Sequence, residues 1–148
     1  MALVTGQVAR TNSFETGWSA HLAERDGGWE QDTLICDDQA LVMNVRGKGL
    51  VVLSGCGHAG IINCVTYAQA LTGVQQVHAV FGGFHLGPDA FMDRVPSVVE
   101  ALVALNPQVV VPAPCTGYRA QFALQRAMPE AFVQNTVGTH ITLSADPE

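Results

Sequence analysis

Histidine, cysteine and glycine recur in three short segments of the sequence that could carry chemistry. The segments are residues 54–60 (SGCGHAG), 82–87 (GGFHLG) and 112–117 (PAPCTG), called the first, second and third loop below. A neutral imidazole is the commonest metal ligand, a thiolate binds zinc-like ions, and glycine allows close backbone approach. His58 and His85 are therefore the candidate metal ligands, and Cys56 and Cys115 are possible additional ligands.

Other interpretations of these residues stay open at this point. A lone histidine after a strand is often a hydrogen-bonded structural residue, and a free cysteine is often a small buried side chain. Thr116 and Gly117 could cap a helix, or the free N–H groups there could bind an anion or a substrate. Asp37 and Asp38 could be a pair of catalytic carboxylates or part of a turn.

The apolar pattern places each loop directly after a strand. It predicts a hairpin and two further strands, at residues 40–45, 50–53, 77–81 and 108–111. It also predicts helices at about residues 60–71, 89–105 and 118–128, with Pro96 in the first turn of the second helix, which then begins near Arg94. Alternating strands and helices are typical of βαβ units with parallel strands. Because the carboxyl ends of parallel strands meet at one edge, we expect the three loops to meet there.

The rest of the chain is less regular. Residues 17–31 are expected to be a loop, and residues about 140–143 are expected to form a closing strand. Three further histidines, His21, His78 and His140, lie outside the three loops, and we interpret them as structural or solvent-exposed.

Composition limits the classes of partner. The chain has 148 residues, which predicts a single domain over residues 1–148, and only 14% are charged against about 25% in an ordinary globular domain. Eleven charged residues lie in residues 1–48, and none lies in residues 49–88 or 101–118. The net charge of −6 disfavours nucleic acid and anionic membrane surfaces as partners.

Location and redox state follow from the same composition. The apolar runs of five or six residues are too short to cross a bilayer, which takes about 20. No signal-peptide pattern begins the sequence, so a cytoplasmic location is expected. The four cysteines form no CxxC pair and are expected to be thiols.

At these loops the sequence resembles the metallo-β-lactamase fold superfamily, in particular the metallohydrolases related to the archaeal dihydropterin ribofuranosyl-aminobenzene-phosphate synthases. The matching motifs are DDQAL at 37–41, GCGHAGI at 55–61 followed by Asn63, GGFHL at 82–86 and CTG at 115–117. The resemblance implies an αββα sandwich with one or two metal ions, zinc, manganese or iron. At such a site a metal-activated hydroxide attacks an ester, a phosphodiester or a related bond.

The sequence departs from the superfamily pattern at two places. It contains no HxHxDH motif, which in the superfamily lies in the N-terminal half, and Pro114 stands where the superfamily has a histidine ligand. The expected fold is therefore α/β, half of the αββα sandwich, with a mixed sheet and about three helices. It corresponds to the C-terminal half. Of the ligands that the resemblance carries over, His58 and His85 remain.

Two imidazoles do not make a catalytic zinc site, which needs three protein ligands and an open position. A third ligand could come from Cys56, Cys115 or a second chain, and without one we expect weak metal binding or none. The function expected first is a metallo-β-lactamase-like half domain that is inactive as an isolated chain, so whether it is an enzyme stays open. One alternative is a hydrolase of a phosphate ester, a phosphodiester or a related bond, with its site completed by a second chain. The other is a non-catalytic module that binds an anion or a protein.

The half sandwich also predicts a partner. Without the second half, one apolar face of the sheet is left uncovered, and monomeric proteins rarely expose such a face. We therefore expect a homodimer, or a partner that supplies the N-terminal half.

Overall fold

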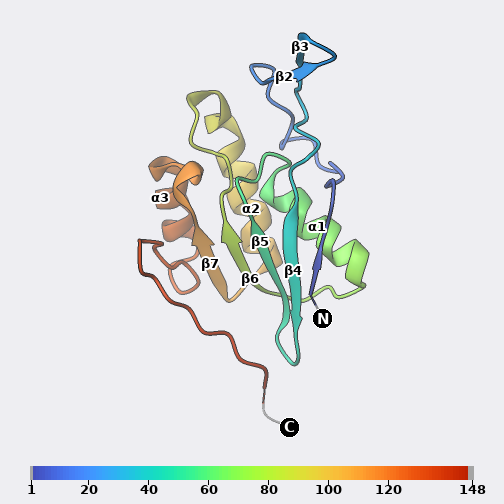
Figure 1. The fold of residues 1–148 in the computed structure, drawn as a ribbon. Coiled ribbons are helices and arrows are strands. Elements are labelled where there is room, and N and C mark those ends of the chain that lie inside the picture. The colour runs from blue at the N-terminus through green and yellow to red at the C-terminus, as the bar shows by residue number, and fades with distance from the viewer. Residues whose placement is uncertain (1, 147–148) are drawn as a thin grey trace.

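A mixed five-stranded sheet with the strand order β1-β4-β5-β6-β7 forms the centre of the chain, whose residues 2–146 are described by a computed structural model (Figure 1). The strands are β1 (Ala2–Val4), β4 (Ala40–Val45), β5 (Gly49–Ser54), β6 (Val77–Gly82) and β7 (Val109–Pro112). β1, β4 and β5 pair antiparallel, and β5, β6 and β7 pair in parallel. The carboxyl ends of β5, β6 and β7 therefore share one edge of the sheet, as predicted.

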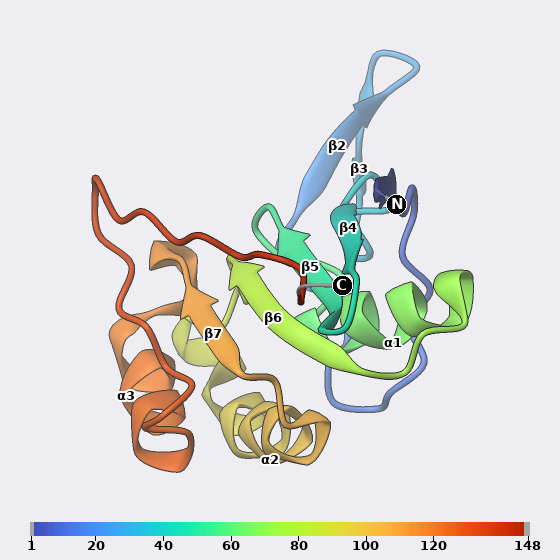
Figure 2. The same ribbon diagram turned by 90° about the horizontal axis from the view of Figure 1, so that it is seen from below.

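Three helices lie on one side of this sheet (Figure 2). They are α1 (Ile61–Thr72), α2 (Val95–Leu105) and α3 (Tyr118–Ala127), and two short 3₁₀ helices, η1 (Asp89–Arg94) and η2 (Pro114–Thr116), precede the second and the third. The predicted α/β fold of strands alternating with helices is confirmed. Pro96 lies in the first turn of α2, because η1 takes up the residues before it. No helix within residues 2–146 has the length and apolarity needed to cross a membrane.

Residues 17–31 differ from the loop that was expected. They contain a separate antiparallel hairpin of β2 (Leu22–Arg25) and β3 (Gly28–Gln31), which projects from the main sheet at the top of Figure 1. Asp26 and Gly27 join its strands with φ values of 51° and 81°, as a tight hairpin turn requires. The strands were missed because most of their residues are exposed, so no apolar alternation marks them.

The closing strand expected at residues 140–143 is absent, and no helix or strand is assigned after α3 in the described part of the chain. The edge of β7 is instead taken by Phe132, which forms a parallel bridge with Val110. The following segment crosses the side of the sheet opposite the helices (Figure 2). In this segment the N–H of Asp146 donates to the carbonyl of Arg46, and its carboxylate pairs with Lys48.

The hydrophobic core lies between the sheet and the helices, and the opposite face of the sheet is only partly covered. Alternate strand residues such as Val42 and Val52 face the helices and are buried. Their neighbours Leu41 and Leu53 face the other way and are 37% and 41% exposed. One face of the sheet therefore carries accessible apolar side chains.

Glu15 holds the start of α1 in place. Its carboxylate accepts hydrogen bonds from the N–H groups of Ile62 (3.0 Å) and Asn63 (2.9 Å), in the first turn of a helix that has no side-chain cap of its own. Burial raises the pKa of Glu15, against the effect of these hydrogen bonds. Gly60, with φ 96°, leaves room for this carboxyl group, since a Cβ there would lie 2.3 Å from its Cδ. The N-terminal segment is thereby fixed beside the first loop.

Replacing this carboxylate tests its role. Glu15→Ala should lower the free energy of unfolding by about 2–3 kcal/mol, because two buried N–H groups would lose their acceptor. Glu24→Ala, at an exposed position of β2, is the matched control and should change it by less than about 0.5 kcal/mol. Urea unfolding followed by circular dichroism measures both, and equal stability of the two variants would contradict this role.

Candidate metal centre

The first and second loops are joined by hydrogen bonds in both directions. The Ser54 hydroxyl donates to the carbonyl of Gly83 (2.8 Å), and the N–H of Gly83 donates to the carbonyl of Gly55 (2.9 Å). The close approach depends on Gly83 having no side chain. A Cβ there would lie 2.2 Å from the Sγ of Cys115 and 2.8 Å from the Cα of Cys56. The two loops therefore hold a fixed position relative to each other.

The third loop packs against the second. The carbonyl of Cys115 accepts from the N–H of Gly87 (3.1 Å), and the fully buried hydroxyl of Thr116 accepts from the N–H of Phe84 (3.2 Å). Thr116 thus fixes the second loop, and Gly117 with φ 76° leads into α3. Anion or substrate binding by Thr116 and Gly117 stays a prediction.

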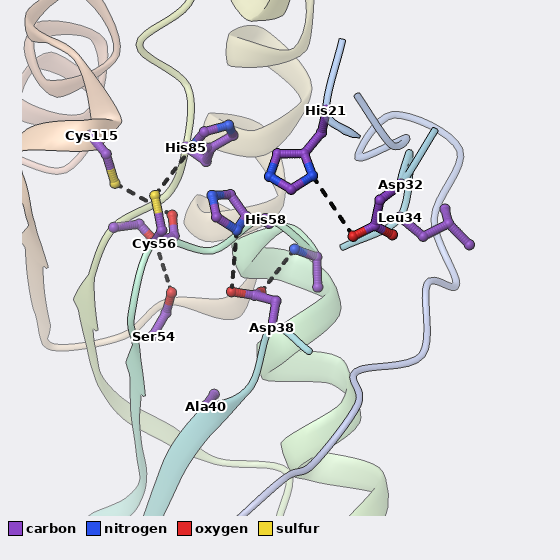
Figure 3. A network of polar contacts seen from close by, with 12 residues as sticks. His21, Asp32, Leu34, Asp38, Ala40, Ser54, Cys56, His58, His85 and Cys115 are labelled. Carbon is purple, nitrogen blue, oxygen red and sulfur yellow. Dashed lines mark hydrogen bonds and ion pairs between the residues drawn. The ribbon is translucent and has the colours of Figure 1, made fainter. Parts of the chain in front are cut away.

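Cys56, His58 and His85 converge at this edge of the sheet (Figure 3). One donor atom from each lies within 4.8 Å of the others. The Sγ of Cys56 is 3.3 Å from the Nδ1 of His85, and the rings of His58 and His85 stand 4.4 Å apart between centroids at 88°. The structure thus brings together both histidines and one of the two cysteines that the sequence pointed to.

These three residues fit a divalent ion. The Nε2 of His85 is buried and has no hydrogen-bond partner, which is uncommon for a buried polar atom unless an ion or a ligand satisfies it. Two imidazoles and a thiol are donors that zinc prefers, and three protein ligands are the number found in catalytic zinc sites. Cys115, the other possible ligand, lies behind Cys56 with its Sγ 3.4 Å from that residue's carbonyl oxygen, outside the group of three.

Asp38 stands behind His58. One of its carboxylate oxygens accepts from the N–H of Ala59 (2.9 Å), and the other is 4.0 Å from the Nδ1 of His58 (Figure 3). A carboxylate beside an imidazole orients the ring and determines which nitrogen carries the proton. Of the two acidic residues considered from the sequence, Asp38 therefore faces the site, whereas Asp37 is exposed.

The protonation states follow from burial. Burial raises the pKa of the Cys56 thiol to about 12, with Cys115 and Asp38 acting in the same direction. Burial also lowers the pKa of His85, helped by the neighbouring His58. At neutral pH the imidazole of His85 is ready to bind an ion, but the thiol must first lose its proton. Metal binding should therefore release a proton and strengthen as the pH rises.

Aromatic side chains enclose His85 on its other side. The rings of Trp18 and Phe91 lie 5.7 Å and 5.3 Å from the His85 ring, and the guanidinium of Arg94 covers Phe91 at 4.0 Å. A cavity of about 20 Å³, little more than the volume that one water molecule needs, is lined by these residues and by His58. The site is therefore narrow and partly screened from solvent.

His21 is a residue of this region that sequence reasoning missed. Its ring lies 6.5 Å from the ring of His58, and its Nδ1 is 3.7 Å from a carboxylate oxygen of Asp32. The sequence signal that could have found it is the turn at Asp26 and Gly27, which pairs His21 with Asp32 across the hairpin.

The remaining histidines and cysteines behave as expected. His78 is buried in β6, and burial lowers its pKa. His140 is exposed. All four cysteines are free, which confirms that they are thiols.

No protein-family model matches the chain. The crystal structure of Tm1679, described as a metal-dependent hydrolase of the beta-lactamase superfamily, is similar with a TM-score of 0.75 and 26% identity, over 93% of this chain and 57% of that chain.

Two curated proteins of Methanocaldococcus jannaschii are similar in sequence. The first is 7,8-dihydropterin-6-methyl-4-(beta-D-ribofuranosyl)-aminobenzene-5'-phosphate synthase, 35% identical over 96 residues, 65% of this chain and 32% of that protein. The second is the uncharacterized protein MJ0448, 30% identical over 138 residues, 92% of this chain and 47% of that protein. The chain thus spans 32% and 47% of the length of the two curated relatives that it matches.

The fold and the sequence similarity together define an α/β half domain of the β-lactamase type. In fold the chain is similar to a metal-dependent hydrolase of the beta-lactamase superfamily, which supports the resemblance that the loop motifs predicted. In sequence it is similar to the dihydropterin ribofuranosyl-aminobenzene-phosphate synthase.

A single methyl group tests the packing of the loops. Gly83→Ala should lower the free energy of unfolding by about 1–3 kcal/mol, because its Cβ would overlap Cys115 and Cys56. Gly55→Ala is the matched control, since a Cβ there meets nothing within 4 Å. Thermal and urea unfolding measure both variants. A Gly83→Ala protein as stable as the control would show that the loops are less tightly packed than described.

Proposed function

We propose that this chain is a metal-binding half domain of the metallo-β-lactamase type, with Cys56, His58 and His85 as ligands. The observation that carries the proposal is the convergence of their donor atoms within 4.8 Å at the edge of the sheet. Zinc is the proposed ion, because a thiolate donor favours zinc over manganese and imidazoles suit both zinc and iron. The similarity to a metal-dependent hydrolase supports the same assignment.

The chain's own residues would prepare the site for such an ion. Asp38 orients His58, the hydrogen bonds of Ser54 fix the two loops, and Trp18 and Phe91 keep solvent from one side of His85. When bound, a zinc ion polarises the bond to be broken and lowers the pKa of water.

Hydrolysis is proposed to need donors from outside these 148 residues. The sequence has no HxHxDH motif, and Pro114 has no donor atom at a position where the superfamily has a ligand. The isolated chain is thus proposed to bind metal without turnover. A phosphate ester, a phosphodiester or a related bond is the proposed substrate class of the completed site.

Metal titration tests the ligand assignment. The metal-free protein should bind about one equivalent of zinc by calorimetry and melt at a higher temperature afterwards. Cys56→Ala and His58→Ala should each weaken binding more than about 100-fold, because even changes behind the ligands weaken metal binding 10–100-fold. The exposed Cys36 and His140 provide the matched controls Cys36→Ala and His140→Ala, which should bind as the wild type does.

Two outcomes would contradict the proposal. If the protein bound less than a tenth of an equivalent of zinc and gained no thermal stability, the proposed metal site would be contradicted. Zinc-dependent cleavage of a nitrophenyl phosphodiester by the isolated chain, lost in His58→Ala, would instead identify it as a complete hydrolase.

The proposal includes a second copy of the chain on the helix-free face of the sheet. Val4, Leu41 and Leu53 are neighbours across β1, β4 and β5 on that face and are 59%, 37% and 41% exposed. The similar hydrolase chain extends well beyond the 57% that this fold matches, which leaves length for another layer. Two copies packed sheet on sheet about a two-fold axis would form such a layer.

Light scattering coupled to size exclusion tests this assembly at micromolar concentration. The wild type should have twice the chain mass of 15.7 kDa, and Leu53→Asp should be monomeric because the interface would bury a charge. Leu71→Asp is the matched control, on α1 and 46% exposed, and should remain a dimer. A monomeric wild type would contradict the second copy and favour a different partner.

A further inference from the structure

We infer that His21 is a fourth protein ligand of this metal centre, presented by the base of the β2–β3 hairpin. The inference rests on the metal site proposed above and adds a residue from a different part of the chain. His21 lies outside the three loops, so neither the loop motifs nor the position of the sheet edge predicts it at the metal centre.

His21 and Asp32 face each other at the base of the hairpin. The N–H of Asp32 donates to the carbonyl of His21 (2.9 Å), directly before the first ladder pair, Leu22 and Gln31. Residues opposed across an antiparallel pair have side chains on the same side. The Nδ1 of His21 accordingly lies 3.7 Å from Asp32, and in Figure 3 the other ring nitrogen points toward His58 and His85.

This arrangement is the one that orients a histidine for metal binding. Histidine ligands commonly have a carboxylate on the nitrogen that faces away from the ion. The Nδ1 of His21 is buried and makes no hydrogen bond. The carboxylate of Asp32, at 3.7 Å, is the charged group beside this nitrogen. Arg25 lies 3.7 Å from the other oxygen of Asp32. The same relation holds between Asp38 and His58.

The base of the hairpin is tied to the rest of the domain. The N–H of Trp18 donates to the carbonyl of Thr33 (2.8 Å), and the Trp18 ring packs against His85. The guanidinium of Arg94 donates to the carbonyls of Thr16 (2.9 Å) and Gly17 (3.1 Å) and to the Thr16 hydroxyl (2.9 Å). These contacts join the segments on either side of the β2–β3 hairpin to the residues that line the metal centre.

A fourth donor changes what the site can do. Cys56, His58 and His85 leave one of four positions open, whereas His21 would fill it and make a closed set of one thiolate and three imidazoles. The ring of His21 stands 6.5 Å from that of His58, further than the 4.4 Å between His58 and His85, and His21 lies outside the group whose donor atoms are within 4.8 Å of one another. A closed set would hold the ion without a position for water, in keeping with an isolated chain that binds metal without turnover.

Cobalt titration tests this ligand directly, because the visible absorption of Co²⁺ reports its coordination. Wild-type protein freed of metal should give the intense bands of a four-coordinate ion. His21→Ala should bind Co²⁺ at least about 10-fold more weakly, with altered bands, and added imidazole should restore them. Asp32→Asn should weaken binding in the same direction. Glu24→Gln, on the exposed part of the hairpin, is the matched control and should behave as the wild type does.

Rescue by imidazole separates a lost ligand from a damaged hairpin, since free imidazole replaces a donor but does not refold a strand. A His21→Ala protein with wild-type affinity and wild-type bands, alongside a Cys56→Ala protein that has lost binding, would overturn this inference and leave the proposed metal site standing. Weakened binding that imidazole does not restore would also overturn it. A wild type that binds neither Co²⁺ nor Zn²⁺ would overturn the proposed function itself.

Discussion

The candidate metal centre depends on the contact between the first and second loops. β5 and β6 pair in parallel up to Ser54 and Gly82, and directly beyond them the backbone of Gly83 bonds to Gly55 and to the hydroxyl of Ser54. This contact brings Cys56 and His85 to 3.3 Å although β5 and β6 are separated in sequence by the whole of α1. It also requires a glycine, because Cys115 occupies the place of a side chain.

Sequence patterns could predict the parallel strands, the helices between them and the loops at the carboxyl ends of the strands. The continuous apolar strands and the helices between them have a strong periodicity, and parallel pairing brings their carboxyl ends together. His58 and His85 could therefore be placed together without a structure. Pro96 located the start of α2, because a ring inside the helix would remove a hydrogen bond.

The parts that could not be predicted depend on contacts without a periodic signal. The β2–β3 hairpin has mostly exposed residues, so its pairing is set by the turn at Asp26, and the sequence left His21 as a structural or solvent-exposed residue. The role of Thr116 depends on where the second loop passes, since its hydroxyl accepts from Phe84. The sequence could not show which of Asp37 and Asp38 faces the site, because this depends on the position of the Ala59 N–H, which donates to Asp38.

The uneven distribution of charge in the sequence has a spatial counterpart. The stretch of residues 49–88, which contains Cys56, His58 and His85, has no charged residue, so it supplies no carboxylate of its own to the site. The fold supplies that neighbour from the charged first third of the chain, where Asp38 lies behind His58 and Asp32 lies behind His21. A dication bound by a single thiolate retains a positive charge, which these carboxylates would offset at short range. The N-terminal third of the chain therefore contributes the carboxylates of the site, whereas the metal-binding donors lie mainly in the loops.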